Sequence, residues 1–225
     1  MSQSDSFIEE VNDELRRERL FATFRRYGWL ALLVIVLIVG GAAWHEYRKS
    51  QDRAAAERLG DELLAAMAEE DGALRSQTLA EIAAPSAEAR AVVSLLAAGS
   101  AVQAGDTDQA VAELDAAATD GEVPEIYRQI AAFKALLLQA ESLDPGALRG
   151  RLEGLAQPGS PIRLLCEEQI ALLDIREGKN DEAIARYQNI LQDAELTPDL
   201  QQRALQVIVA LGGTPELLGQ TAPDQ

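Results

Sequence analysis

Residues 170–191 read IALLDIREGKNDEAIARYQNIL, and this stretch decides the fold. Apolar residues recur at helical spacing on both sides of the polar segment REGKNDEA, in which Gly178 to Asp181 form a turn signal. The pattern predicts helices over 161–177 and 180–194 that a tight turn joins into a hairpin. The small side chains of Ala171 and Ala183 let two helices approach closely, and Gly178 permits the turn.

The same kind of turn signal recurs along the chain, at Gly72, Gly105, Ser142–Pro145 and Gly178–Asp181. The intervals of about 33, 38 and 36 residues are typical of stacked helical hairpins, each of which buries its apolar face against its neighbours. The fold class is therefore predicted as all-α, a solenoid of about four helical hairpins plus a closing helix. The predicted helices are 46–70, 73–83, 86–103, 107–118, 124–140, 145–156, 161–177, 180–194 and 198–211. Asp144-Pro145, Ser160-Pro161, Thr197-Pro198 and Thr214-Pro215 are predicted helix starts, with an oxygen-bearing cap before a proline.

A second feature precedes the repeats: residues 28–44, GWLALLVIVLIVGGAAW, contain no charged residue. As a helix this run would reach roughly 25 Å, at the short end of segments that span the ~30 Å hydrocarbon layer. Two alternatives are a buried core helix and a cleavable signal peptide, for which Gly41-Ala42-Ala43 offers small residues. The long acidic lead before the run favours an uncleaved transmembrane signal anchor. The predicted domains are a lead over 1–27, the anchor over 28–44, the repeat domain over 45–214 and a tail over 215–225.

The arginines before the run predict its orientation. Arg25 and Arg26, together with arginines at 16, 17 and 19, lie where basic residues resist translocation, so the lead is expected in the cytoplasm. The lead is either an amphipathic helix at the membrane interface or a solvated segment. Trp29 and Trp44 bracket the run and are predicted to lie at the two membrane interfaces. The repeat domain is then expected in the periplasm of a bacterium, as part of a single-pass inner-membrane protein.

Composition excludes several classes of function. A net charge of −17 and a pI near 4.4 argue against nucleic-acid binding. Cys166 is the only cysteine, so no internal disulfide can form. His45 is the only histidine and lies at the predicted membrane edge, so no cysteine–histidine pair, serine–histidine–acid arrangement or thiolate–imidazole metal site is expected within the repeat domain. Asp106 begins a segment similar to a calcium loop, but Ala117 stands at its twelfth position, where glutamate is required. We expect no enzyme activity, no cofactor and no metal, and a Cys166 that fills a small buried position.

Protein binding remains as the expected function. Beyond Tyr47, the only aromatic residues of the chain are Tyr127, Phe133 and Tyr187, and they serve either core packing or ligand contact, with core packing favoured. The functional alternative is a groove with an acidic rim, suited to a basic or amphipathic partner segment. Asp115 and Glu182 are two acidic positions at which substitution would test such a groove.

The repeat segments resemble tetratricopeptide repeats. Residues 170–191 match the pattern of that family through their small residues and the glycine of the turn. Residues 97–117, AAGSAVQAGDTDQAVAELDAA, match the same pattern. The signature positions are Ala98, Gly105, Ala110, Leu114, Ala171, Gly178, Ala183, Tyr187 and Ile190. Glu167 departs from the pattern, because the family often has a large aromatic residue there.

The whole layout, from the lead DELRRERLFATFRRYGW through one span to an acidic repeat domain ending QRALQVIVALGG, resembles the YfgM-like family of ancillary SecYEG translocon subunits. That resemblance implies a periplasmic repeat domain near the protein-export channel that hands newly exported chains to chaperones. The implied partners are Sec translocon subunits and periplasmic chaperones, with the membrane contacted through one spanning helix. The alternative is an envelope adaptor that organises cell-division or cell-wall machinery through the same repeats. The oligomeric state stays open.

Overall fold

The computed structural model describes residues 4–216, with side chains described for residues 29, 30 and 32–216. These residues form nine α-helices and no strand. The helices are α1 (Ser4–Met67), α2 (Gly72–Ala80), α3 (Ala87–Gln103), α4 (Thr107–Thr119), α5 (Glu125–Leu138), α6 (Pro145–Leu155), α7 (Arg163–Arg176), α8 (Asn180–Leu191) and α9 (Pro198–Ala210). The predicted all-α class is confirmed, and from α2 onward the helices end within a few residues of their predicted bounds.

Two units make up the chain, one ending at Arg58 and the other beginning at Leu59. In the first unit α1 is continuous, and its apolar side chains from Leu32 to Val39 are between 45% and 66% exposed. Among the residues whose side chains are described, no helix is both long enough and apolar enough to cross a membrane. Gly28 and Ala31 lie outside those residues, so the anchor over 28–44 stays a prediction. Arg25 and Arg26 lie outside them as well.

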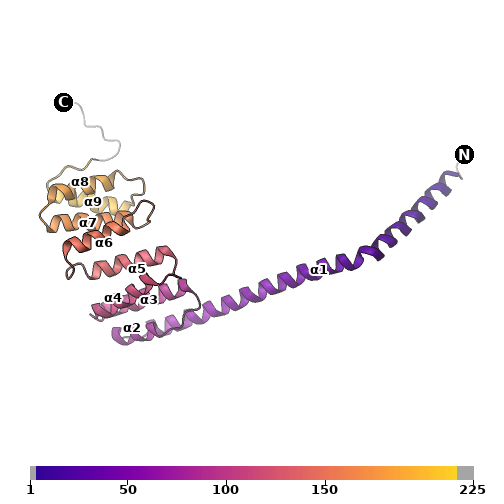
Figure 1. The fold of residues 1–225 in the computed structure, drawn as a ribbon, viewed down its shortest axis with the longest axis horizontal. Coiled ribbons are helices and arrows are strands. Elements are labelled where there is room, and N and C mark those ends of the chain that lie inside the picture. The colour runs from indigo at the N-terminus through magenta and orange to yellow at the C-terminus, as the bar shows by residue number, and fades with distance from the viewer. Residues whose placement is uncertain (1–3, 217–225) are drawn as a thin grey trace, which may run out of the picture. The chain divides into compact units, whose positions relative to one another are not determined.

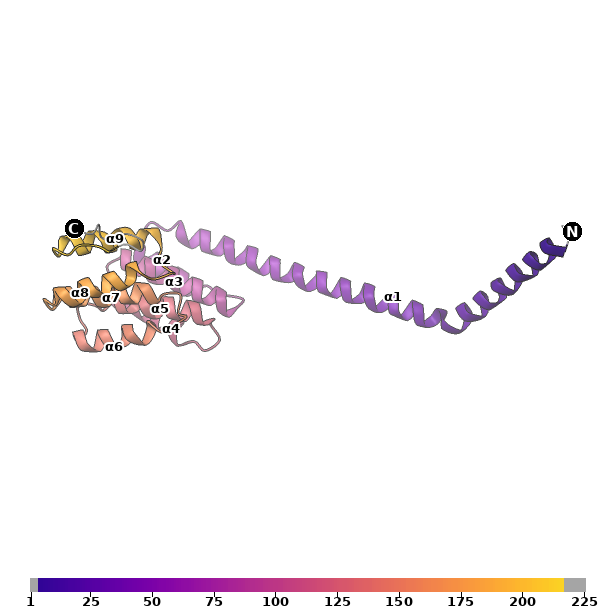
Figure 2. The ribbon, with the colours of Figure 1, turned by 90° about the horizontal axis from the view of Figure 1, so that it is seen from above.

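In the second unit, consecutive helices pack against each other from α2 to α9, and α3 also contacts α5. Figure 1 shows these helices stacked with roughly parallel axes, from α2 at one end of the unit to α8 and α9 at the other, and Figure 2 shows the same helices from above, where they overlap. The described helices thus form sequential hairpins in a tetratricopeptide-like stack. Contacts between neighbours in the chain are typical of solenoids, in which each repeat is stabilised mainly by the next.

The core of the second unit is divided into four small clusters, each shared by consecutive helices. The first joins the end of α1 to α2 and α3, and the second joins α3, α4 and α5 almost entirely through alanine. The third joins α5, α6 and α7, and the fourth joins α7, α8 and α9. Large side chains fill the last two clusters, where Leu152, Ile170, Tyr187 and Ile208 are each at most 1% exposed.

The two turns with the clearest sequence signal have the same geometry. Gly105 and Gly178 have positive φ angles of 79° and 75°, in the left-handed region that glycine adopts without steric cost. After each glycine the next backbone N–H donates to a carbonyl in the preceding helix: Asp106 to Ala101 at 2.9 Å, and Lys179 to Asp174 at 2.8 Å. This closure ends one helix and begins the next within a few residues.

Helix starts follow the capping prediction at two of the four proline sites. The side chains of Asp144 and Thr197 accept from backbone N–H groups of α6 and α9. The prediction at Ser160 is wrong, because α7 begins at Arg163 after Ile162, and the Ser160 hydroxyl instead donates to the side-chain oxygen of Gln129 at 3.2 Å. No helix begins at Thr214 within the residues described, which end at 216.

An arginine clamp occurs twice with identical spacing. In each copy an arginine of one helix donates to two carboxylates in the loop after the next helix, at distances between 2.6 and 3.0 Å. The first clamp is Arg90 with Asp120 and Glu122, and the second is Arg163 with Asp193 and Glu195. The shift from residue 90 to residue 163 is 73 residues, and it is the same from 120 to 193 and from 122 to 195. The α3–α4 and α7–α8 hairpins are therefore two copies of one unit, separated by two repeat periods.

The aspartate of each clamp has a lowered pKa. The pKa of Asp193 is lowered because its side chain accepts from the backbone N–H of Glu195 and from the Arg163 guanidinium. The pKa of Asp120 is lowered for the same two reasons, through Glu122 and Arg90. Both aspartates are charged in the folded state at neutral pH, and each clamp connects the loop after a hairpin to the start of the first helix of that hairpin.

Candidate protein-binding surface

Exposed apolar side chains of the second unit concentrate on the odd-numbered helices, which are the first helices of their hairpins. They are Leu64 and Met67 at the end of α1, Val92 and Val102 on α3, Ile126 and Leu137 on α5, Leu165 and Leu172 on α7, and Val209 on α9. Among the even-numbered helices only Leu74 of α2 is a large apolar residue exposed to this degree within the described residues. Solenoids of helical hairpins bind partners on extended surfaces of this kind.

On α5 and α7 the exposed apolar residues are spaced as single helical stripes. Leu165, Gln169, Leu172 and Arg176 follow one another at intervals of four, three and four residues, which places them on one side of α7. Ile126, Ile130, Phe133 and Leu137 repeat that spacing on α5. We call these two stripes together the α5–α7 face.

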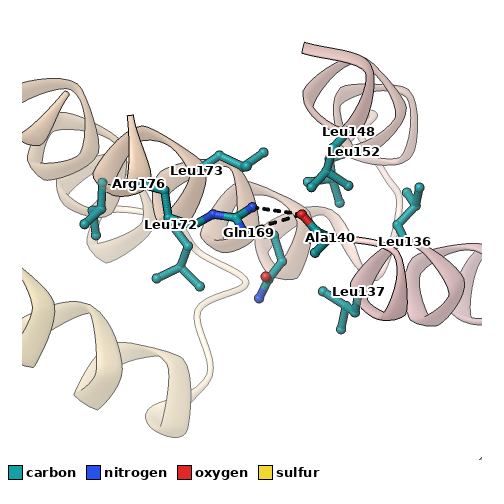
Figure 3. Close-up of a pocket in the computed structure, with 10 residues that line it drawn as sticks. Leu136, Leu137, Ala140, Leu148, Leu152, Gln169, Leu172, Leu173 and Arg176 are labelled. Carbon is teal, nitrogen blue, oxygen red and sulfur yellow. Dashed lines mark hydrogen bonds between the residues drawn. The ribbon is translucent and has the colours of Figure 1, made fainter. Parts of the chain in front are cut away.

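A pocket of about 310 Å³ opens at one end of the α5–α7 face, between α5, α6 and α7. Figure 3 shows its leucine lining, with Leu148 and Leu152 on α6 and Leu172 and Leu173 on α7. Leu148 and Leu152 are buried, whereas Leu137 and Leu172 are 39% and 38% exposed and lie at the mouth. The volume is near the lower end of the range for ligand pockets, so it suits one or two apolar side chains.

Two polar side chains interrupt this lining, Gln169 and Arg176. The Arg176 guanidinium reaches across to the end of α5 and donates to the Ala140 carbonyl, at 3.4 Å from each terminal nitrogen. These contacts are long for hydrogen bonds, and Arg176 forms no ion pair with any residue that the structure describes. Its charge is therefore available at the mouth of the pocket.

The carboxylates of α7, in contrast, are all neutralised. Glu168 and Asp174 are 7% and 3% exposed, and burial of an unpaired carboxylate would be costly. Each has an arginine partner from a neighbouring helix. The same holds for two more exposed glutamates, Glu167 within α7 and Glu177 at its C-terminal cap. The pairs are Glu168 with Arg203 of α9, Asp174 with Arg149 of α6 and Arg186 of α8, Glu167 with Arg186, and Glu177 with Arg149 and Lys179.

This network explains the departure at Glu167. An ion pair of 2.5 Å to Arg186 connects the two helices of the hairpin at that position, where a large aromatic residue would otherwise fill the space. Sequence reasoning missed the network, because the arginines lie 12 to 35 residues along the chain from the carboxylates that they pair with.

The predicted signature residues lie inside the stack. Ala98, Ala110, Leu114, Ala171, Ala183, Tyr187 and Ile190 are at most 2% exposed, and Gly105 and Gly178 form the two turns. Burial raises the pKa of Tyr187 to about 12, with Glu168 adding to the shift. These residues hold helices together and offer nothing to a partner. Phe133 packs against the third core cluster, and Tyr127 is half-buried at the start of α5.

Two predicted positions of the second unit lie on helices that do not form the α5–α7 face. Asp115 and Glu182 are exposed on α4 and α8, which are even-numbered helices. In the first unit, Trp29 and Trp44 are 64% and 62% exposed, and the Arg48 guanidinium lies 5.6 Å from the centroid of the Trp44 ring.

Cys166 is not placed for nucleophilic chemistry. Cys166 is fully buried, and burial raises the pKa of its thiol to about 12, so the reactive thiolate is not formed at neutral pH. No group of three or more histidine, cysteine, aspartate or glutamate side chains in this part of the chain is placed to hold a metal ion. An apolar pocket beside a free cation is suited to binding a ligand.

Comparison with known protein families agrees with this geometry. The profile of the tetratricopeptide repeat-like domain matches residues 24–208. The chain belongs to this family. A search of curated proteins and a search of solved structures each found no match. Tetratricopeptide repeat-like domains typically act as non-catalytic scaffolds that bind other proteins, which is the coarse function that the family assigns.

Proposed function

We propose that this chain is a membrane-anchored scaffold whose repeat domain binds protein partners through the α5–α7 face. The observation that carries the proposal is the placement of exposed apolar residues on the odd-numbered helices, next to a leucine-lined pocket. A stable stack gains nothing from leaving Ile126, Leu137, Leu165 and Leu172 partly in water, and apolar patches on a soluble surface commonly mark interaction sites.

The anchor in this proposal is the run over 28–44. Its support is the absence of any charged residue in the run and the exposure of its apolar side chains from Leu32 to Val39. A lipid bilayer would cover such a surface on all sides. Trp44, with Tyr47 and Arg48 beside its ring, would then lie at the interface, where aromatic and basic side chains are favoured. The arginine-rich lead remains in the cytoplasm and the repeats face the periplasm.

The setting in this proposal is protein export. The family match extends from residue 24 across the proposed anchor and into the repeats, in line with the YfgM-like layout of lead, span and acidic repeat domain. In that setting the repeats assist newly exported chains as they leave the Sec translocon and pass to periplasmic chaperones.

The test is carbonate extraction followed by crosslinking in the native membrane. The proposal expects the full-length chain to stay in the membrane pellet after an alkaline carbonate wash, and crosslinking to recover translocon subunits. Release of the chain into the wash would refute the anchor. Recovery of only cell-division or cell-wall proteins would refute the export setting and favour the envelope-adaptor alternative.

A further inference from the structure

We infer that the pocket between α5, α6 and α7 selects a partner segment in which a bulky aliphatic side chain lies within two residues of an aspartate or glutamate. This inference rests on the proposed protein-binding function and names the chemistry of the segment bound. The aliphatic side chain enters the leucine-lined pocket, and the carboxylate pairs with Arg176.

The aliphatic half of the inference comes from the lining. Buried Leu148 and Leu152 form the α6 side, and exposed Leu137 and Leu172 stand at the mouth. Inserting an aliphatic side chain would remove apolar surface of both partners from water, which is the dominant favourable term in association. Gln169 is the one uncharged polar side chain in the lining and is available to a backbone group of the segment.

The acidic half comes from the local charge balance, which is opposite to that of the whole chain. The net charge of −17 favours a basic partner at long range. At the pocket, however, the carboxylates of α7 and of its cap Glu177 all have basic partners, whereas Arg176 has none. A guanidinium carries five N–H donors, and its two contacts to the Ala140 carbonyl are long, so a carboxylate can be bound in a bidentate manner.

Two nearby charges must be considered with Arg176. Lys134 is exposed on α5 and, like Arg176, forms no ion pair with a described residue, but it does not line the pocket. Glu141 follows Ala140, is exposed and is also without an ion pair among those residues. The negative charge of Glu141 therefore weakens the attraction between Arg176 and a partner carboxylate. Removing that charge in Glu141→Gln should strengthen binding.

The other copy of the hairpin lacks this site. At a shift of 73 residues, the position of Leu172 is Gly99 and that of Arg176 is Gln103. The Gln103 side-chain oxygen accepts a hydrogen bond of 2.6 Å from Arg75. Gly99 therefore cannot replace the apolar side chain of Leu172, and Gln103 cannot replace the cation of Arg176. The selection of an aliphatic and acidic segment is accordingly a property of the pocket between α5, α6 and α7 and not of every repeat.

Peptide selection on the full-length chain in detergent tests the inference. A phage library that displays random twelve-residue peptides without a free C-terminus is selected in parallel on the natural chain and on Arg176→Glu. The selected peptides are then synthesised with amidated and with free C-termini, and their binding is measured by fluorescence anisotropy. Protection of the Cys166 thiol from labelling shows that each variant is folded, because Cys166 is fully buried.

We expect the natural chain to select peptides with an aliphatic residue near aspartate or glutamate, and Arg176→Glu to select lysine or arginine there instead. Binding of the acidic peptides should fall at least tenfold in Arg176→Glu and in Leu172→Glu, and should rise in Glu141→Gln. Leu74→Glu is the matched control, since Leu74 is an exposed leucine of α2, 49% exposed, and lies outside both the α5–α7 face and the pocket. It should change affinity less than twofold.

Three outcomes would overturn the inference: selection of basic peptides by the natural chain, an unchanged preference in Arg176→Glu, or binding that requires a free C-terminal carboxylate. Failure to enrich any peptide would overturn it as well. The proposed function would survive each of these results if partners in the native membrane still crosslink to the α5–α7 face, so the two claims fail separately.

Discussion

Replacing Ile208 with alanine is the sharpest test of how the repeat stack is held together. Ile208 of α9 is fully buried in the fourth core cluster, which also contains Leu164 of α7. The substitution removes three carbon atoms at about 0.8 kcal/mol each and leaves a cavity, so we expect a loss of about 3 kcal/mol in unfolding free energy. Val209→Ala is the matched control, because Val209 is the next residue and is 62% exposed. Its cost should stay below about 0.5 kcal/mol.

The assay uses the only cysteine as a reporter. Cys166 lies on α7, is fully buried, and reacts with a thiol reagent only when that part of the stack opens. Leu164 connects α7 to the cluster around Ile208, so weakening α9 should promote opening at Cys166. If the open stack recloses faster than the reagent reacts, a loss of about 3 kcal/mol makes labelling of Cys166 in Ile208→Ala roughly 100-fold faster than in the natural chain. For Val209→Ala the same relation gives about a twofold increase.

Two results would refute this reasoning. Equal acceleration in Ile208→Ala and Val209→Ala would mean that burial in the cluster does not determine stability. No acceleration in Ile208→Ala would mean that α7 and α9 open independently, in which case the fourth cluster does not couple them. Repeat proteins are capable of such stepwise unfolding, which makes the second result a real alternative.

Two further predictions concern the turns and the clamps. Gly178→Ala should destabilise the chain by about 1 kcal/mol through its φ of +75° alone, since no atom lies within 4 Å of the added Cβ. Gly99→Ala, in the middle of α3, should stabilise the chain by about 0.5–1 kcal/mol. Thermal denaturation in which Gly178→Ala and Gly99→Ala change the stability in the same direction would contradict this. Arg163→Met should cost about 1 kcal/mol at neutral pH, as the loss of a partly exposed ion-pair group. The folded-state pKa of Asp193 lies below its ordinary value of 3.8, so the stability it supplies is complete above that pH and is lost as the pH falls through the lowered value. The stability difference between the natural chain and Asp193→Asn should therefore shrink in denaturation series below about pH 3.8, and a difference independent of pH would contradict the clamp.

The helices of the repeat domain could be predicted because local signals determine them. Gly105 and Gly178 mark turns that need a positive φ, and apolar periodicity marks the flanking helices. The start of α7 was misplaced at Ser160, because its hydroxyl has a long-range partner, Gln129, that local capping rules do not consider. Tertiary contacts override a local preference there.

The clamps and the candidate site depend on contacts between residues far apart in sequence. Arg90 and Arg163 reach carboxylates 30 and 32 residues away, and single-residue patterns do not reveal such pairs. A comparison of the chain with itself at a shift of 73 residues would have revealed both clamps, because their spacing is identical. No equivalent signal exists for the pocket, whose mouth depends on which leucines the stack leaves uncovered.

The expectation of an acidic groove shows the same limit. Total charge predicted attraction for basic segments, and Asp115 and Glu182 were natural positions to test. The structure places both on even-numbered helices and pairs the carboxylates of α7 with arginines, so composition did not predict the charge at the pocket. Pairing within the fold decides which charges remain available to a partner.

The most direct test of the central claim is site-specific photocrosslinking in the native membrane. A photoreactive amino acid replaces Leu137 or Leu172 on the α5–α7 face, or Asp115 or Glu182 on the even-numbered helices, in the full-length chain. The proposed function predicts protein crosslinks from Leu137 and Leu172 and few or none from Asp115 and Glu182. Crosslinks from Asp115 and Glu182, with none from the leucines, would contradict the claim that the α5–α7 face binds the partner.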